Sequence, residues 1–221
     1  RIEAAWGVIP VGSDVEQILL DMLEDGVLGF YDPKKKTLFI GDFVSSSMLS
    51  QVVGHEIAHG LQDMHFDLEK RMEPMRHRSD AEEAQRFLIE GGAQAAYLAW
   101  VSGQDGLQAI DDAALDAMVD QTLEMAGAMA PHPILARSLH LPYTAGTASV
   151  IRVVLRDGWQ GIDALYDALP QTTEQMLHVD KLRAREPARP VHVDHDAVAA
   201  ALKQQVVWHD QVGEAALLAM L

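Results

Sequence analysis

The spacing of apolar residues changes along the first part of the chain, and it predicts the first elements of structure. Ser13-Asp14-Val15-Glu16 is a capping box, and the apolar residues after it recur at helical spacing as far as Gly26. This pattern predicts a helix of about twelve residues. Two short strand-like runs follow at residues 27–31 and 37–40, and Asp32-Pro33 with three lysines lies between them. We therefore expect a β-hairpin with a solvated turn.

Two longer helical patterns come next. Residues 45–69 open with a serine cluster suited to N-capping, and residues 80–99 open at Asp80, which we expect to cap a second helix. In the first of these segments the apolar residues lie three to five positions apart, which predicts that they face the protein interior. They are Met48, Val52, Val53, Ile57 and Leu61.

The second half of the chain is also mainly helical by pattern. Helices are expected at residues 113–129, 144–156 and 162–168, with proline-rich breaks near residues 131–133 and 187–190. No linker rich in Pro, Gly or Ser divides the 221 residues, and no internal repeat is visible. The sequence therefore predicts one domain over residues 1–221, of the α+β class and predominantly helical.

Inside the first long helix lies the sequence His55-Glu56-Ile57-Ala58-His59. Residues four apart share a helix face, so His55 and His59 can both reach one zinc ion, with ligand distances of about 2.0–2.1 Å. Glu56 lies beside them, where it can take a proton from a zinc-activated water. The alternative is a chance match in a chain with ten histidines, and the apolar helix around the motif favours the metal site.

A catalytic zinc usually has three protein ligands, so a third one is expected elsewhere. His65 has the histidine spacing of the metzincin pattern, but Gln62 replaces the glycine that ends the helix in that pattern. Glu90 is the stronger candidate, because a carboxylate between apolar residues needs a partner if buried, and two glycines would let another backbone or a substrate approach closely. The alternative for Glu90 is an exposed helix residue beside a kink.

The motif and the segment Glu90-Gly91-Gly92-Ala93 together resemble the gluzincin metallopeptidases. Most of the chain, from residue 29 to residue 221, also resembles a largely uncharacterised set of bacterial HExxH proteins. The resemblance implies a zincin-like fold with a small N-terminal hairpin, one Zn²⁺ held by His55, His59 and Glu90, and Glu56 as catalytic base. The chain departs from the thermolysin branch of this group at Gln94, where that branch has an aspartate that orients a zinc histidine.

Three further residues are candidates for supporting roles. Asp63, one turn beyond His59, has the spacing to hold an imidazole N–H. An oxyanion beside zinc needs another hydrogen-bond donor, and Tyr143 and His178 are the candidates for this catalytic role. The alternatives are a packing tyrosine and a histidine that interacts with a helix dipole. The backbone of residues 38–40 is a candidate for pairing with extended substrate.

Composition narrows the classes of partner. The chain has 33 acidic and 17 basic side chains and a net charge of −16, which disfavours nucleic acid. No apolar run approaches the ~18 residues of a membrane span, so a soluble domain is expected. Because cysteine is absent, zinc must rest on histidine and carboxylate. The chain begins at Arg1 without a signal peptide, which is typical of a piece of a longer product, and an exported or cell-envelope parent fits.

These observations predict a zinc metallopeptidase acting on a peptide or protein substrate. Two alternatives stay open: a catalytically silent binding or scaffold module with the same fold, and a zinc amidohydrolase for a non-peptide amide, because zinc and a base serve amide hydrolysis in general.

Overall fold

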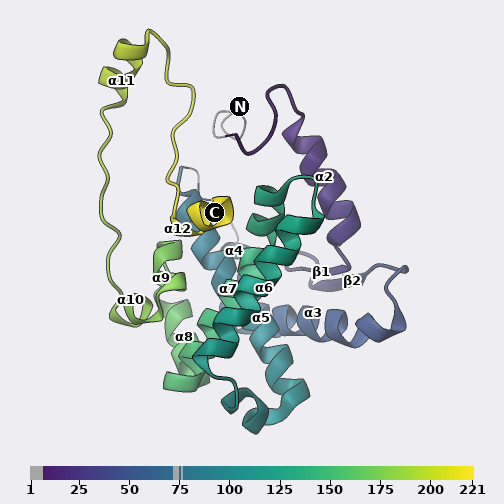
Figure 1. Ribbon diagram of the computed structural model, residues 1–221. Helices are drawn as coiled ribbons and strands as arrows, with labels where there is room; N and C mark the ends of the chain where they lie inside the picture. The colour runs from purple at the N-terminus through teal and green to yellow at the C-terminus, as the bar shows by residue number, and fades with distance from the viewer. Residues whose placement is uncertain (1–6, 72–74, 76) are drawn as a thin grey trace.

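The computed structural model describes residues 7–71, 75 and 77–221 (Figure 1). It is predominantly helical, with 68% of residues in helices, and its described part contains one two-stranded antiparallel sheet. The expectation of a mainly helical chain with an N-terminal hairpin is confirmed.

The first elements are α2 (Val15–Gly26), β1 (Gly29–Asp32), β2 (Thr37–Ile40), α3 (Ser46–Phe66) and α4 (Leu68–Arg71). They are followed by α5 (Ser79–Gln108), α6 (Asp112–Met129), α7 (Pro133–Asp157), α8 (Trp159–Asp167), α9 (Thr173–Leu177), α10 (Val179–Ala184), α11 (His195–Leu202) and α12 (Glu214–Met220).

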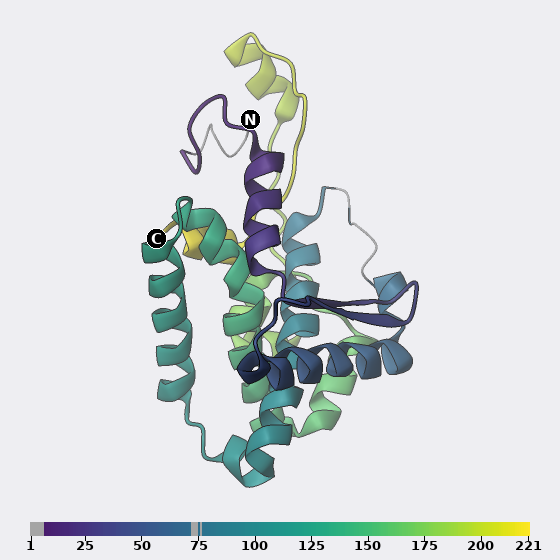
Figure 2. The ribbon, with the colours of Figure 1, turned by 90° about the vertical axis from the view of Figure 1, so that its right-hand side faces the viewer.

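The hairpin lies along α3, as Figure 2 shows. Phe30 pairs with Phe39, and their rings stack on the outer side of the sheet with centroids 4.8 Å apart. On the inner side Gly29 lies so close to α3 that a Cβ atom there would be 2.8 Å from Val52. The glycine therefore allows the sheet to approach the helix. The lysine turn is not wholly solvated, because Lys36 donates to the carboxylate of Asp63 at 2.8 Å.

Helix α3 turns its polar side toward the protein interior, which corrects the expected burial of its apolar residues. Val52 is buried, but Met48, Ile57 and Leu61 are 42%, 52% and 54% exposed. The residues that are buried with Val52 are His55, Glu56, Ala58, His59 and Asp63. A buried polar face costs desolvation free energy unless its groups have partners, so this face is built for interactions rather than for packing.

The core forms mainly where α5 crosses α7, with α6 packed on α7. Phe87 and Leu88 of α5 and Val150 and Ile151 of α7 are fully buried there. The close approach depends on Gly146, because a Cβ atom at that position would lie 2.6 Å from the carbonyl oxygen of Phe87.

Helix α7 begins at Pro133, eleven residues before the expected residue 144. The sequence pattern missed this first part because it contains two prolines, which usually mark a break in a helix. Pro133 stands in the first turn, where a missing N–H costs nothing because that group has no partner in the helix. Pro142 lies inside the helix and is buried. At the start of α5, Asp80 does not cap the helix but accepts hydrogen bonds from the backbone and hydroxyl of Thr173, which anchors α9.

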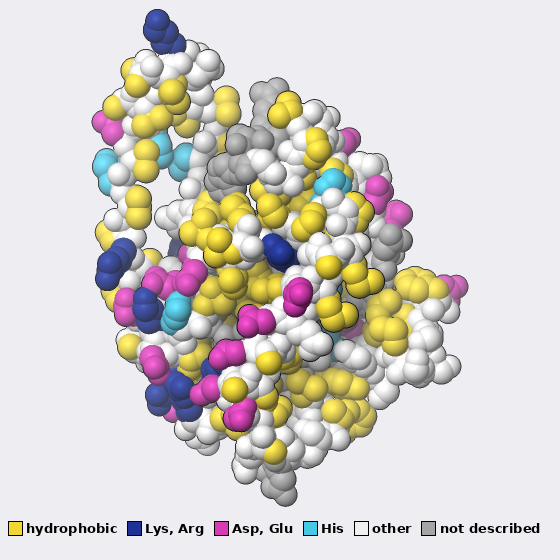
Figure 3. All heavy atoms as spheres, in the orientation of Figure 1, with side chains coloured by type: hydrophobic (Ala, Val, Ile, Leu, Met, Phe, Trp, Pro, Cys, Tyr) yellow, Lys and Arg dark blue, Asp and Glu magenta, His cyan; other side chains and the backbone are white. Residues whose placement is uncertain are grey.

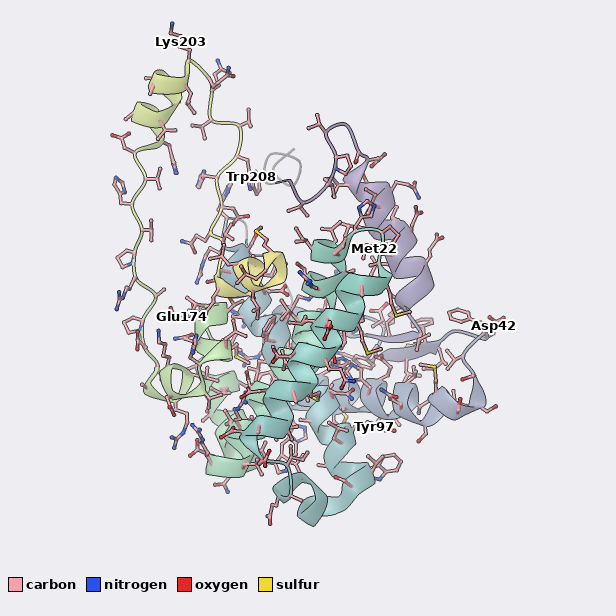
Figure 4. All side chains as sticks on the ribbon, viewed as in Figure 1. Met22, Asp42, Tyr97, Glu174, Lys203 and Trp208 are labelled. Atoms are coloured by element: carbon pink, nitrogen blue, oxygen red, sulfur yellow. The ribbon has the colours of Figure 1, made fainter. Side chains whose placement is uncertain are left out.

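The chain between α10 and α12 forms an arm, residues 186–213, that extends away from the helical body (Figures 1 and 3). Helix α11 at its outer part has no buried residue. Lys203 marks the outer end of the arm, and Trp208 lies on its returning leg (Figure 4). The next residues are tied to the body, because Asp210 accepts hydrogen bonds from the backbone and hydroxyl of Ser79. Among the described residues, none of the helices combines the length and the apolar composition of a membrane span.

Candidate metal centre

Helix α3 presents two imidazoles and one carboxylate on its buried face. His55 and His59 are one helical turn apart, and their Nε2 atoms are 3.1 Å apart. Their rings meet edge to face, with centroids 4.6 Å apart. Glu56 follows His55 directly and is buried as well. The HEIAH segment thus provides two imidazole nitrogens at one point and a carboxylate beside it.

Glu90 of α5 completes the cluster. Its Oε2 atom lies 3.3 Å from His55 Nε2 and 3.1 Å from His59 Nε2. Zinc ligands at about 2.0–2.2 Å in a tetrahedron are roughly 3.3–3.6 Å apart, so the three separations fit a common ion after shifts of a few tenths of an ångström. Within the described part of the chain, these three residues form the one group of histidine and carboxylate ligands that converges in this way. The group can hold a metal ion.

The charges of the cluster favour a cation. Burial alone would raise the pKa of Glu90, but the hydrogen bonds and charges of His55 and His59 hold it well below its usual range. Burial alone would lower the pKa of His59, but its partner Glu90 raises it. The cluster therefore contains a carboxylate that remains ionised in a buried place. A divalent cation between the three ligands would neutralise that charge in place of a proton shared with an imidazole.

Two glycines place Glu90 between α3 and α7. A Cβ atom on Gly91 would lie 2.7 Å from the backbone nitrogen of Thr147, so α5 and α7 meet backbone to backbone. A Cβ atom on Gly92 would lie 2.7 Å from the side-chain nitrogen of Gln62 on α3. The expectation that these glycines admit another backbone is confirmed for Gly91. Gly92 admits a side chain instead.

Gln62 fixes the orientation of one histidine. Its Nε2 donates to the carbonyl oxygen of Ile89 at 2.9 Å, so its Oε1 faces the imidazole of His59 and accepts from Nδ1 at 2.9 Å. With the proton on Nδ1, the Nε2 lone pair of His59 points toward Glu90 and is free for a metal. From the sequence, Gln62 was noted only because it replaces the glycine of the metzincin pattern. Its position three residues after His59 on the same helix could have indicated a contact between the two side chains.

Asp63 was a candidate by its spacing for holding an imidazole N–H, and the structure gives it other partners. Its carboxylate accepts hydrogen bonds from the Tyr31 hydroxyl at 2.7 Å, from Lys36 at 2.8 Å and from the backbone of Leu68 at 3.1 Å. The residue points from α3 toward the hairpin and the following turn, so it joins three segments. The remaining imidazole nitrogen of the cluster, Nδ1 of His55, is buried, and none of the described residues bonds to it.

The Glu56 carboxylate lies between the candidate metal ligands and the hairpin. Burial raises its pKa, while His59 and His55 lower it. The backbone N–H of Tyr31, in β1, also lowers the pKa of Glu56 as a hydrogen-bond donor. The register of the hairpin agrees, because Gly41 donates to Leu28 at 2.9 Å and, by alternation, the N–H and C=O groups of Tyr31 point away from β2.

Tyr143 of α7 is part of the same cluster of side chains. Its ring centroid lies 5.9 Å from that of His55. Burial raises the pKa of its hydroxyl, and so does Glu90, both through its charge and as a hydrogen-bond partner. The hydroxyl therefore stays protonated at neutral pH and is available as a donor beside the ligands.

The structure brings neither His65 nor His178 to the cluster. Helix α3 continues through Gln62 to Phe66, so His65 points elsewhere, and its Nδ1 contacts the carbonyl oxygen of Leu61 at 3.0 Å. His178 lies between α9 and α10, where its Nε2 is 2.9 Å from Glu214 of α12. Both groups of that pair are about half exposed. The geometry thus leaves Glu90 as the third member of the candidate metal-binding group and Tyr143 as the hydroxyl beside it.

Comparison with protein-family models, with curated proteins and with solved structures finds no match to this chain. The assignment of a function therefore depends on the residues of the cluster and on their geometry.

Proposed function

We propose that this chain is a zinc-dependent peptidase of the gluzincin type with a zincin-like fold. The observation that supports the proposal is the convergence of His55, His59 and Glu90, with Glu56 buried next to them. Two neutral imidazoles and a carboxylate form the ligand set of a catalytic zinc that keeps one position open. The small hairpin beside the motif helix and the glutamate on a second helix agree with the zincin-like arrangement.

The proposed chemistry assigns one role to each residue. Zinc, when bound, would polarise the scissile carbonyl and lower the pKa of a water to about 7. Glu56 then accepts a proton from the attacking water and returns it to the leaving nitrogen, for which its raised pKa is suited. Tyr143 donates a hydrogen bond to the carbonyl oxygen as negative charge develops on it. Gln62 keeps the His59 ring in position.

The free edge of β1 is the proposed place for an extended substrate. Its outward groups at Tyr31 lie next to Glu56, which takes the N–H, so a peptide paired with the remaining outward groups of this edge would pass the catalytic carboxylate. The edge of β2, at Leu38 and Ile40, points away from it. This assignment replaces residues 38–40 with β1 as the candidate pairing strand.

The test is the zinc content of purified chains, together with turnover. We expect about one zinc per wild-type chain and little in Glu90→Ala, while His65→Ala should retain it. Glu56→Gln should keep zinc and the fold but lose hydrolysis, because only the base is removed. Zinc retained in Glu90→Ala and lost in His65→Ala would reject the ligand set, and undiminished turnover by Glu56→Gln would remove that residue from its role.

A peptide-library digest separates a peptidase from a silent scaffold module. Wild-type protein should cleave members of the library in the presence of zinc and stop when a chelator is added. Glu56→Gln serves as the matched control, because it should bind zinc without cleaving. A zinc-loaded wild type that cleaves no peptide would favour the module or a non-peptide amide as substrate.

A further inference from the structure

The side of α5 that carries Glu90, the proposed metal ligand, also carries charged residues in the turns before it. Residues three, four and seven apart on a helix share a face, so Glu83, Arg86, Glu90 and Tyr97 form one stripe. Tyr97 packs against α3, since a Cβ atom on Gly54 would lie 2.5 Å from its ring. The stripe therefore faces the side of α5 on which the HEIAH helix lies.

Arg86 stands one turn before Glu90 in this stripe. Among the described residues, its guanidinium contacts one carboxylate, that of Glu83, three residues earlier on the same helix. This contact counts both as a hydrogen bond and as an ion pair, and it is long, at 3.4 Å. The Arg86 side chain is 42% exposed, and exposed pairs of this kind contribute little to stability. Among the described residues, most of the donors of its guanidinium are thus left for another acceptor.

Helical spacing places Arg86 on the side of α5 that carries Glu90, one turn away from it. The electrostatics of Tyr143 agree, because after burial Glu90 and Glu56 raise the pKa of its hydroxyl and Arg86 lowers it. The Tyr143 residue is itself 40% exposed, so this side is accessible from solvent.

A cation beside a zinc site is costly unless an anion joins it. A zinc ion with charge +2 would be balanced by the carboxylates of Glu90 and Glu56, and Glu83 is the counter-ion that the described residues offer to Arg86. Their single contact is 3.4 Å long and partly exposed, so the guanidinium can bind a second carboxylate. An arginine fork binds a carboxylate through two parallel hydrogen bonds, which is the geometry that satisfies its free donors.

We infer that Arg86 is the specificity-determining residue of the site and binds a carboxylate of the substrate next to the scissile bond. This inference rests on the proposed function. Four residues along a helix span about 6 Å, and consecutive Cα atoms are about 3.8 Å apart. A carboxylate on the residue beside the scissile bond is therefore within reach of the Arg86 side chain. Either an acidic side chain or the C-terminal carboxylate of a peptide supplies this group.

Hydroxamate binding to the zinc-loaded protein tests the inference without any turnover. Acetohydroxamate binds zinc alone, whereas the monohydroxamate of succinic acid adds a carboxylate two carbons away. We expect calorimetry on the wild type to give a dissociation constant about tenfold lower for the second probe. In Arg86→Gln the ratio of the two constants should fall to near one. Because a ratio is measured, a general loss of affinity does not imitate this result.

Two further variants control the experiment. Arg156→Gln removes an arginine of α7 that pairs with Asp180, and it should keep the wild-type ratio. Arg86→Lys keeps the charge but not the fork, and an intermediate ratio is expected. If Arg86→Gln fails to fold or to hold zinc, the lysine variant decides: a wild-type ratio there would reject the role of the fork.

The outcomes separate the two proposals. A wild type that binds zinc and both probes equally would overturn the inference about Arg86 and leave the proposed function standing. A wild type that holds no zinc would overturn the proposed function and the inference with it. If the ratio depends on Arg86, matched peptides identify the source of the carboxylate: loss of cleavage on amidation of the C-terminus indicates an exopeptidase, and loss on Asp to Asn exchange indicates an acidic side chain.

Discussion

Gly91 of α5 and Gly146 of α7 meet backbone to backbone, and this contact sets the position of the neighbouring Glu90. A Cβ atom on either glycine would overlap the other helix. The proposed third metal ligand therefore owes its place to two residues without side chains, which lie on different helices.

Gly91→Ala should push α5 away from α7 and displace the Glu90 carboxylate. Over-packing of this kind costs about 1–3 kcal/mol of unfolding free energy, and the displaced ligand should also lower zinc content. Urea unfolding and elemental analysis measure the two effects. Gly26→Ala is the matched control at the end of α2, where a Cβ atom meets nothing within 4 Å, and it should change neither. Wild-type zinc content in Gly91→Ala would show that the crossing does not position the ligand.

Gln62→Leu should weaken zinc binding by roughly 10–100-fold, because partners that orient a ligating histidine have effects of that size. Competition with a chromogenic chelator measures the affinity. The control is Gln94→Leu at the position where the thermolysin branch has its orienting aspartate. None of the described residues hydrogen-bonds to Gln94, so zinc affinity should stay as in the wild type. The opposite pattern would return the orienting role to Gln94.

Asp63→Asn should change how stability depends on pH. Burial alone would raise the pKa of Asp63, but Lys36 and Tyr31 hold it below its usual value. A depressed folded-state pKa stabilises the protein above the unfolded value of about 3.9, and this contribution is lost as pH falls below that value. The asparagine variant should therefore be less stable by about 1–3 kcal/mol at pH 7, and its stability should decline less steeply below pH 4.

Urea unfolding of the metal-free chains between pH 7 and pH 3, with EDTA present, measures this difference without a contribution from zinc release. Asp112→Asn is the control, because its carboxylate pairs with Arg152 at the surface and is 66% exposed. It should have little effect at any pH. Parallel pH profiles for wild type and Asp63→Asn would contradict the prediction.

Tyr143→Phe should lower kcat by roughly 10²–10³-fold, the range found for removal of one oxyanion donor. Zinc content should not change, since the hydroxyl is not among the three converging ligands. Single-turnover kinetics with a cleaved library peptide measure the chemical step. Equal kcat in the two chains would assign the ring a packing role against His55.

The sequence predicted the elements that present the cluster, because each has a strong local signal. The helix after Ser13-Asp14 begins with an Asp14 cap that accepts from Gln17, and the hairpin and the HEIAH helix lie where the pattern placed them. What the pattern could not show is which side of α3 faces inward. The motif face is buried against α5, and this depends on the distant contact between Gln62 and Ile89.

The supporting contacts were less predictable for the same reason. Helical spacing alone allowed Asp63 to face an imidazole, but the hairpin supplies Tyr31 and Lys36 as closer partners. His178 appeared suitable from its place near a helix end, and α12 supplies Glu214 to it from 36 residues away. Such pairings are set by tertiary contacts that lie far apart along the chain.

The arm has a consequence for how the protein withstands proteases. Its outer helix α11 buries no residue, while Ala215 and Ala219 of α12 beyond it are buried against the core. Cleavage within the arm should therefore be rapid and yet leave the C-terminal helix in place. A nicked molecule would run as two fragments in a denaturing gel and as one species in a native column, with the proposed metal ligands of α3 and α5 in the larger fragment.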